Sequence, residues 1–156
     1  MAAGAGPVSD TQRSRLRDLL GEILPANRFY ARKLGDVAPD TDLSELPFTT
    51  KAELVADQRA NPPYGTDLTY PPERYSRFHQ TSGTTTGRPL CWLDTPESWE
   101  RLLDCWLQVY RLVGVGPGDR VFFPFSFGPF LGFWTAFEAA SRLGCLCLPA
   151  GGMSTT

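Results

Sequence analysis

Between Val121 and Phe137 the chain runs for seventeen residues without a charged side chain, as "VFFPFSFGPFLGFWTAF". Seventeen apolar residues are the lower limit for a helix that crosses a membrane. Two prolines and two glycines interrupt the middle of this run, and such residues break a helix. We therefore predict a buried strand, a loop and the start of a helix here, and no membrane span.

The residues around this run predict a strand–helix–strand unit. "RVFFPF" predicts a buried strand, residues 130–143 a helix, and "CLCLPA" a second buried strand. Continuously apolar strands on either side of a helix are typical of a parallel sheet that is covered on both faces. The predicted fold class is α/β, with an N-terminal helical arm followed by the beginning of a mostly parallel sheet with covering helices.

The predicted helix at 130–143 needs more cover than the rest of the chain offers. It is apolar nearly all round, with Glu138 and Arg142 as its only charged residues. The other long predicted helix begins at Pro96 after the cap residue Thr95 and carries one apolar stripe. The sequence stops at "GGMSTT", just after the second strand. We therefore expect these 156 residues to be the front part of a larger α/β domain.

Residues 1–72 predict a helical arm and a proline-rich connection. Capping-box patterns, Ser9 with Gln12 and Thr50 with Glu53, mark two helix starts. We expect the first helix to end at Pro25. A second short helix is expected at "NRFYARKLG". Residues 73–156 are predicted to form a partial α/β domain, incomplete at its C-terminus.

Composition excludes several classes of protein. The net charge is −2 with no block of like charge, so the chain does not resemble a nucleic-acid binder. The N-terminus lacks the basic and apolar segments of a secretory signal. Four cysteines without a CxxC spacing and a single histidine do not make a zinc set. We expect free, largely buried thiols and a cytoplasmic location.

The stretch "FHQTSGTTTGRPL", residues 78–90, lies between two predicted strands, "RYSRFHQ" and "LCWLD", and is therefore a turn. A turn rich in glycine, serine and threonine offers backbone N–H groups and hydroxyls to an anion such as phosphate. It is not a Walker-type loop, because only three residues separate Gly83 from Gly87 and no Gly-Lys pair follows. The alternative, a polar surface turn, accounts for few of its hydroxyl residues.

"TSGTTTGRP" resembles the phosphate-binding signature of the AMP-forming acyl-adenylating enzymes. Five further segments resemble the phenylacetate–CoA ligase-like branch of that superfamily and occur in the same order. They are "LPFTTKAEL", "NPPYG", "GVGPGDRV", "FSFGPFLGF" and "RLGCLCLPAGGMST", the first two before the signature and the others after it. The resemblance covers nearly the whole chain after the first helix.

This resemblance implies a nucleotide- and acyl-binding site in residues 73–156. The residues implied to wrap the ATP phosphates are Thr81, Ser82, Gly83, Thr84, Thr85, Thr86 and Gly87. The residues implied to contact the acyl group are Phe125, Phe127, Phe130, Gly151 and Gly152, although plain core packing explains the phenylalanines equally well. His79 is either a donor to phosphate or a structural strand residue, and Arg88 either steers phosphate or is a loop arginine without that role. No catalytic residue and no metal ligand is assigned.

Family members activate a carboxylic acid with ATP and Mg²⁺ and then transfer the acyl group to a thiol, commonly that of coenzyme A. The resemblance therefore implies the N-terminal part of an ATP-dependent carboxylate–CoA ligase acting on an aryl or arylacetyl acid. The family's adenosine motifs and catalytic lysine are not among these residues, so we expect no activity from this chain alone. The alternatives are a split subunit that needs a C-terminal partner chain, and a non-catalytic phosphate-binding module.

Overall fold

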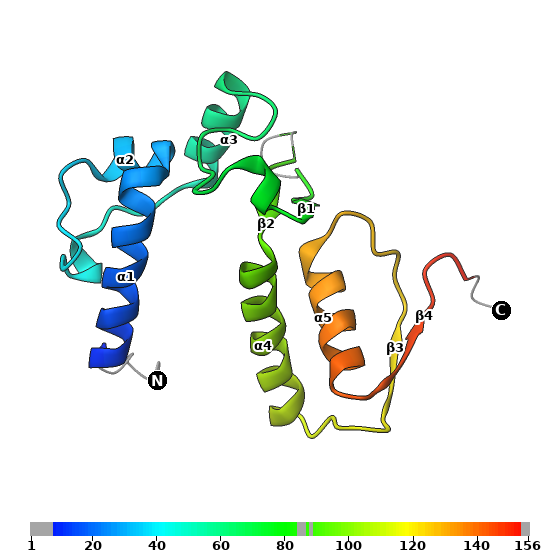
Figure 1. Cartoon of the computed structure of the whole chain (residues 1–156). Helices are drawn as coiled ribbons and strands as arrows, with labels where there is room; N and C mark the ends of the chain where they lie inside the picture. The colour runs from blue at the N-terminus through cyan, green and yellow to red at the C-terminus, as the bar shows by residue number, and fades with distance from the viewer. Residues whose placement is uncertain (1–7, 84–86, 88, 154–156) are drawn as a thin grey trace, which may run out of the picture. The chain divides into compact units, whose positions relative to one another are not determined.

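The structure is a computed structural model that describes residues 8–83, 87 and 89–153 (Figure 1). It divides into two compact units, Met1–Pro72 and Glu73–Thr156. That each unit is a separate folding domain stays a prediction. The first unit contains α1 (Asp10–Ala26), α2 (Arg28–Leu34), the short 3-10 helix η1 (Leu43–Glu45) and α3 (Lys51–Ala60).

Local side-chain hydrogen bonds fix the starts of the helices in the first unit. Both predicted capping boxes are confirmed, with the Ser9 N–H donating to Gln12 Oε1 at 2.8 Å and the Thr50 N–H donating to Glu53 Oε2 at 2.7 Å. The predicted end of α1 at Pro25 is wrong, because the helix includes Pro25 in its last turn. Pro25 has no N–H to donate, so one helical hydrogen bond is missing there. The Asn27 N–H still donates to Ile23 O at 2.7 Å and completes the last turn.

A buried carboxylate joins α3 to the rest of the first unit. Asp57 accepts hydrogen bonds from Arg32 Nη2 at 2.8 Å and from the Thr66 N–H at 2.5 Å. Burial alone would raise the pKa of Asp57, but the hydrogen bonds from Thr66 and Arg32 outweigh it and lower that pKa. The carboxylate is therefore charged and fully partnered, as a buried charge must be.

The second unit contains two strand pairs and two helices. In chain order they are the 3-10 helix η2 (Pro72–Arg74, which begins at the boundary), β1 (Arg77–Gln80), β2 (Cys91–Asp94), α4 (Pro96–Leu112), β3 (Arg120–Phe123), α5 (Leu131–Arg142) and β4 (Leu146–Pro149). The β1–β2 pair is antiparallel, and the β3–β4 pair is parallel and connected through α5. The α/β class and the strand–helix–strand unit are confirmed. In the described part of the chain the parallel sheet consists of this single pair.

The core of the second unit lies around α5, which stands between α4 and the β3–β4 pair in Figure 1. On α5 the fully buried residues are small, namely Thr135, Ala136, Ala139 and Ala140. Small residues let α4 approach closely, and the Tyr110 hydroxyl donates to Ala136 O at 2.9 Å. From the sheet, Phe123 is buried and packs in the same cluster.

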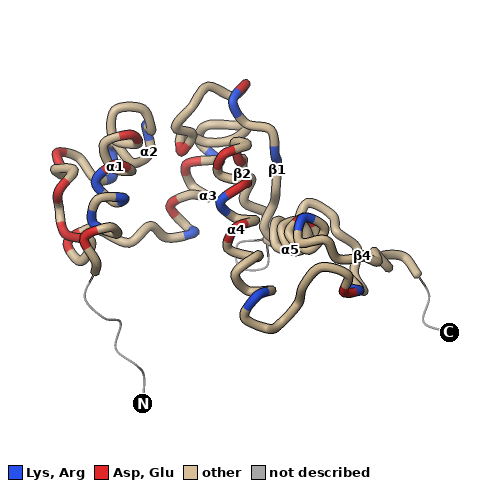
Figure 2. The backbone as a smooth tube through the Cα atoms, turned by 60° about the horizontal axis from the view of Figure 1, so that its bottom comes forward, with Lys and Arg blue, Asp and Glu red and all other residues tan. Residues whose placement is uncertain are grey.

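The β3–β4 pair is covered on one face only within the described residues. Val121, Phe123 and Cys147 pack against the core. Phe122, Leu146 and Leu148 point the other way and are 59%, 55% and 40% exposed. The sequence predicted a sheet covered on both faces, whereas the described residues cover one face. The sequence from Arg120 to Pro149 is almost without charge, with Arg120, Glu138 and Arg142 as its charged residues. In Figure 2 the tube near the labels α5 and β4 is accordingly mostly tan.

None of the four cysteines forms a disulfide, and the expectation that they are largely buried is wrong. Cys105 is exposed on α4, and the other three are half-buried. Cys147 is half-buried although it faces the core, where its thiol donates to Phe137 O at 3.7 Å. Across the described residues, no helix has the length and apolar character needed to cross a membrane.

Candidate functional site

The predicted phosphate turn begins where the β1–β2 hairpin ends. The last pair of the hairpin is Gln80 with Cys91. Beyond it, the Thr81 N–H donates to Leu90 O at 3.0 Å and the Leu90 N–H donates to Thr81 Oγ1 at 2.9 Å. These two bonds hold the base of the turn closed and fix the position of the Thr81 hydroxyl.

Two glycines shape the turn itself. Gly83 and Gly87 have φ values of +72° and +69°, a region that favours glycine, and the Gly87 N–H donates to Gly83 O at 2.8 Å. Thr81, Ser82 and Gly87 are exposed, while Gly83 is buried. Three of the predicted phosphate contacts, Thr84, Thr85 and Thr86, lie outside the described residues, as does Arg88.

His79 lies one residue before the end of β1 and is buried, with 4% of its surface exposed. Its ring stacks on Trp99 of α4, with centroids 5.0 Å apart and planes 8° from parallel. Neither ring nitrogen has a hydrogen-bond partner among the residues that the structure describes. Burial lowers the pKa of His79, and the nearby Asp94 carboxylate opposes that shift only in part. This position favours the structural role over donation to phosphate.

Residues 124–130, hereafter the aromatic turn, connect β3 to α5. Its backbone is held by the Phe125 N–H, which donates to Phe123 O at 2.9 Å, and by Trp134 Nε1, which donates to Gly128 O at 2.8 Å. Phe125 stacks on Phe133 with centroids 4.0 Å apart. Phe125 and Phe127 both pack against the hydrophobic core.

Phe130 differs from the other two predicted acyl contacts because it is 39% exposed, at the N-terminal end of α5. The helix begins one residue later than predicted, so Phe130 is the cap residue. Of the three phenylalanines, it is therefore the one with the most surface left for a ligand, while Phe125 and Phe127 mainly pack the core.

The turn after β4 that contains Gly151 and Gly152, hereafter the glycine turn, lies directly against the aromatic turn. The Ala150 N–H donates to Phe123 O at 3.0 Å. A Cβ atom at Gly151 would lie 2.8 Å from Phe125 O and 2.9 Å from Ser126 Cα, so only glycine allows this approach. Gly152 has a φ of +85°.

A backbone contact joins the phosphate turn to the aromatic turn. The Gln80 N–H, at the last residue of β1, donates to Pro129 O at 2.8 Å. The structure thus brings together three segments that lie far apart in the sequence: the base of the phosphate turn, the aromatic turn and the glycine turn. Sequence reasoning missed the parts played by Gln80, Pro129 and Trp134, and no side-chain pattern signals a contact between two backbones.

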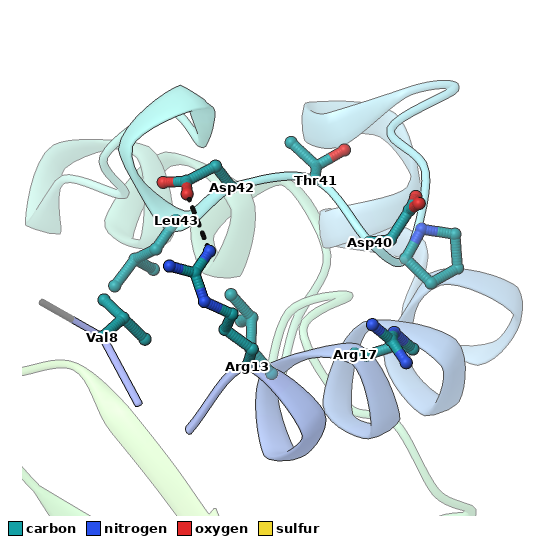
Figure 3. A pocket seen from close by; sticks show the side chains of 9 residues that line it. Val8, Arg13, Arg17, Asp40, Thr41, Asp42 and Leu43 are labelled. Carbon is teal, nitrogen blue, oxygen red and sulfur yellow. Dashed lines mark hydrogen bonds and ion pairs between the residues drawn. The ribbon is translucent and has the colours of Figure 1, made fainter. Parts of the chain in front are cut away.

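A separate small pocket lies in the first unit, between α1 and the segment before η1 (Figure 3). It encloses about 60 Å³, whereas ligand sites commonly enclose about 300–1,000 Å³. Arg13 and Asp42, which line it, form an ion pair at 3.4 Å. The pocket is too small to be a substrate site.

The described residues do not contain a protein cage for a metal ion. No group of three or more His, Cys, Asp or Glu side chains among them is placed to hold one. Mg²⁺ commonly binds through substrate phosphates with one or two carboxylates. Any Mg²⁺ at the phosphate turn would therefore depend on the bound nucleotide.

Comparison with known proteins relates this arrangement to CoA ligases. No model of a known protein family matches the chain. The phenylacetate-coenzyme A ligase of Pseudomonas putida is 35% identical over 114 residues, which cover 73% of this chain and 25% of that ligase. The chain thus spans about a quarter of the length of this curated relative.

Solved structures of 2-hydroxyisobutyryl-CoA ligase have the same fold over nearly all of the chain. The open conformation, in complex with 2-HIB-AMP and CoA, matches with a TM-score of 0.80 and 25% identity over 91% of this chain and 34% of that ligase. The thioesterification state, with the same two ligands, matches with a TM-score of 0.81 and 27% identity over 91% of this chain and 31% of that ligase. Because the chain is 35% identical to a phenylacetate-coenzyme A ligase over 73% of its length and its fold superimposes on that of CoA ligases, it belongs to the phenylacetate–CoA ligase-like branch of the AMP-forming acyl-adenylating superfamily.

Proposed function

We propose that this chain contributes the phosphate loop and part of the acyl pocket of an ATP-dependent, AMP-forming carboxylate–CoA ligase. The observation that carries the proposal is the hydrogen bond from the Gln80 N–H to Pro129 O, which ties the base of the phosphate turn to the aromatic turn. Adenylation needs the nucleotide phosphates beside the carboxylate of the acid. A fixed link between the two segments supplies that proximity.

At the phosphate turn, the proposed role of residues 81–87 is to donate hydrogen bonds to the phosphates of ATP. Charge accumulates on pyrophosphate as it leaves, and preorganised donors stabilise that charge. Exposed Thr81 and Ser82 are suitably placed to donate, and the positive φ values of Gly83 and Gly87 let the backbone reverse around an anion. Mg²⁺, bound with the nucleotide, would supply further charge neutralisation.

At the aromatic turn, the proposed acyl contact is Phe130, whose ring packs edge-on against Phe133. Phe133 in turn stacks on Phe125, and Phe127 packs in the core beside them. The proposed role of Gly151 and Gly152 is to keep the neighbouring turn close to this pocket without a side chain in it. An aromatic wall fits an aryl or arylacetyl acid. The likeness to the Pseudomonas putida phenylacetate-coenzyme A ligase supports the same class of acid. The acyl-adenylate would then react with the thiol of coenzyme A.

Pyrophosphate binding by the purified chain tests the phosphate loop. We expect saturable binding in isothermal titration calorimetry in the presence of Mg²⁺. Ser82→Ala should weaken it by at least about tenfold, because a hydrogen bond to a charged group contributes about 1.5–3 kcal/mol. The matched control is Ser141→Ala, which removes an exposed hydroxyl near the C-terminal end of α5, whereas the aromatic turn precedes its N-terminal end. Absence of binding, or equal weakening by both variants, would contradict the proposed loop.

We expect the chain alone to bind phosphate without turning over ATP. It spans about a quarter to a third of the length of its ligase relatives, and the resemblance places the adenosine site and the catalytic lysine outside these residues. The measurement is ATP–pyrophosphate exchange with phenylacetate as the acid. Exchange above the background of a no-protein control would overturn this expectation and favour a complete enzyme.

A further inference from the structure

Glu138 is the one acidic residue in the sequence of α5, and its carboxylate is bonded to two other elements. Arg77 of β1 pairs with both of its oxygens, Nη1 with Oε1 at 2.9 Å and Nη2 with Oε2 at 3.1 Å. Trp99 of α4 donates from Nε1 to Oε2 at 2.8 Å. One side chain thus joins β1, α4 and α5, and the proposed phosphate and acyl contacts do not include it.

The geometry of this contact fixes the direction of the Arg77 side chain. A guanidinium that bonds both oxygens of a carboxylate is held in one plane, which a single ion pair does not achieve. The guanidinium carbon also lies 4.7 Å from the centroid of the Trp99 ring, a distance typical of a cation–π contact. Trp99 itself is 3% exposed and is part of the core. Arg77 is therefore held by a carboxylate and by a ring that cannot move freely.

The Arg77 contact is the second of two points at which β1 is attached to α5 and the turn before it. The first is the bond from the Gln80 N–H to Pro129 O at 2.8 Å. Arg77 and Gln80 are three residues apart on a strand, which is about 10 Å. A strand attached at one point can rotate about that point, whereas two points fix its direction. The phosphate turn begins directly after Gln80, so both attachments set where the turn lies.

We propose that Glu138 is a positioning residue for the phosphate turn: by holding Arg77 it fixes β1 on α5, so that the turn stays beside the aromatic turn in the arrangement that binds phosphate. This inference rests on the proposed function. Glu138 acts through Arg77 and β1 and is not itself a phosphate contact. Without it, the bond from Gln80 to Pro129 opens more often. The apparent affinity for phosphate then falls in proportion to the time that the turn spends in the binding arrangement.

Glu138→Gln tests this role in the full chain, with pyrophosphate and Mg²⁺ as the probe in isothermal titration calorimetry. The amide keeps an acceptor oxygen for Trp99 Nε1, but it cannot bond Arg77 with two oxygens. We expect pyrophosphate binding to weaken at least about fivefold. Charge alone predicts the opposite sign, because removal of a negative charge should favour an anion. Weaker binding therefore reports position and not charge.

A second variant and a matched control isolate the Arg77 attachment. Arg77→Met should weaken binding about as much as Glu138→Gln, and the double variant should be no weaker than Arg77→Met, because both changes break the same contact. The control is Glu100→Gln, which breaks another ion pair between α4 and α5, that of Glu100 with Arg142, at 2.6 Å between Oε1 and Nη2. It removes the same charge but leaves β1 attached, and we expect its affinity within about twofold of the wild type.

Amide hydrogen exchange measured by NMR without pyrophosphate gives a readout that a purely stabilising contact would not produce. The Gln80 N–H bonds to Pro129 O, whereas the Thr81 N–H bonds to Leu90 O within the hairpin. In Glu138→Gln we expect exchange at Gln80 to be at least tenfold faster and exchange at Thr81 to be unchanged. A general loss of stability would speed both amides alike. The inference falls if both speed alike, if neither changes, or if Glu138→Gln binds pyrophosphate as tightly as Glu100→Gln does.

Failure of this inference is distinguishable from failure of the proposed function. Ser82→Ala should weaken pyrophosphate binding and leave exchange at Gln80 unchanged, whereas Glu138→Gln should change both. A wild-type chain that binds pyrophosphate, with Glu138→Gln binding it equally well, overturns the positioning role alone. A wild-type chain that binds no pyrophosphate overturns the phosphate loop, and exchange at Gln80 then decides by itself whether Glu138 holds β1 in place.

Discussion

Gly151 lies at a point where the backbones of two turns meet and no side chain fits. Family resemblance alone suggests that it lines the acyl pocket, but the contact with Phe125 O gives it a second role as a spacer. In Gly151→Ala the new methyl group would overlap the aromatic turn, so one turn must move. We expect the free energy of unfolding to fall by about 1–3 kcal/mol, measured by urea denaturation.

Gly116→Ala is the control for this prediction. Gly116 lies in the loop before β3, has no atom within 4 Å of the Cβ position and is not among the glycines with positive φ. We expect its unfolding free energy to stay within about 0.5 kcal/mol of the wild type. Equal losses in both variants would show that the close approach at Gly151 is not the cause.

At the same scale, the assignment of the site residues stays a prediction, and the structure adds their surroundings. The threonine and glycine run was predicted from its chemistry and from family resemblance. The burial of His79 was not, because it depends on Trp99, which reaches it from another element. The sequence left the phenylalanines undecided between packing and binding, and their different exposures separate Phe130 from Phe125 and Phe127.

Helix caps carry most of what could be predicted about the elements. Thr50 is the cap of α3, where its hydroxyl accepts from the Glu53 N–H at 3.3 Å and donates to Glu53 Oε2 at 2.8 Å. Thr50→Ala removes both bonds, and we expect the free energy of unfolding to fall by about 1 kcal/mol. Thr50→Ser keeps the hydroxyl and should retain most of that stabilisation. Urea denaturation followed by the helical circular dichroism signal measures the unfolding free energy of both variants. An equal loss of unfolding free energy in Thr50→Ser and Thr50→Ala would contradict the capping role.

Elements were predictable where the signal is local and not where it is long-range. Caps at Ser9, Thr50 and Thr95 act within four residues, so the starts of three helices follow from the sequence. The contact from Gln80 to Pro129 joins residues 49 positions apart through their backbones, and side-chain identity does not encode it. The end of α1 was missed because a proline in a last turn removes only one hydrogen bond.

Across the whole molecule the aromatic residues are unevenly distributed. All four tryptophans, at positions 92, 99, 106 and 134, belong to the Glu73–Thr156 unit. Tryptophan fluorescence of the full chain therefore reports on that unit alone. The chain also has a single histidine, His79, which lies in the same unit and contacts Trp99. A change in stability between pH 7.5 and 5.5 can thus be followed in one unit and tested at one residue.

The direction of that change follows from the lowered pKa of His79. Burial, assisted by the charge of Arg77 and opposed by Asp94 and Glu138, holds the pKa of the folded state below the ordinary value of 6.5. The unfolded chain binds the proton first as the pH falls, so stability is complete above pH 6.5. It is lost between 6.5 and the lower pKa of the folded state, by at most about 1.4 kcal/mol per pH unit.

His79→Phe tests this because it removes the titrating group and keeps a ring to stack on Trp99. For the wild type we expect the urea midpoint of tryptophan fluorescence to fall as the pH is lowered from 7.5 to 5.5. For the variant it should be nearly constant over that range, since no other side chain in the sequence ordinarily titrates there. A wild-type midpoint that does not move, or one that falls equally in His79→Phe, would mean that the His79 ring is not held neutral by its burial against α4.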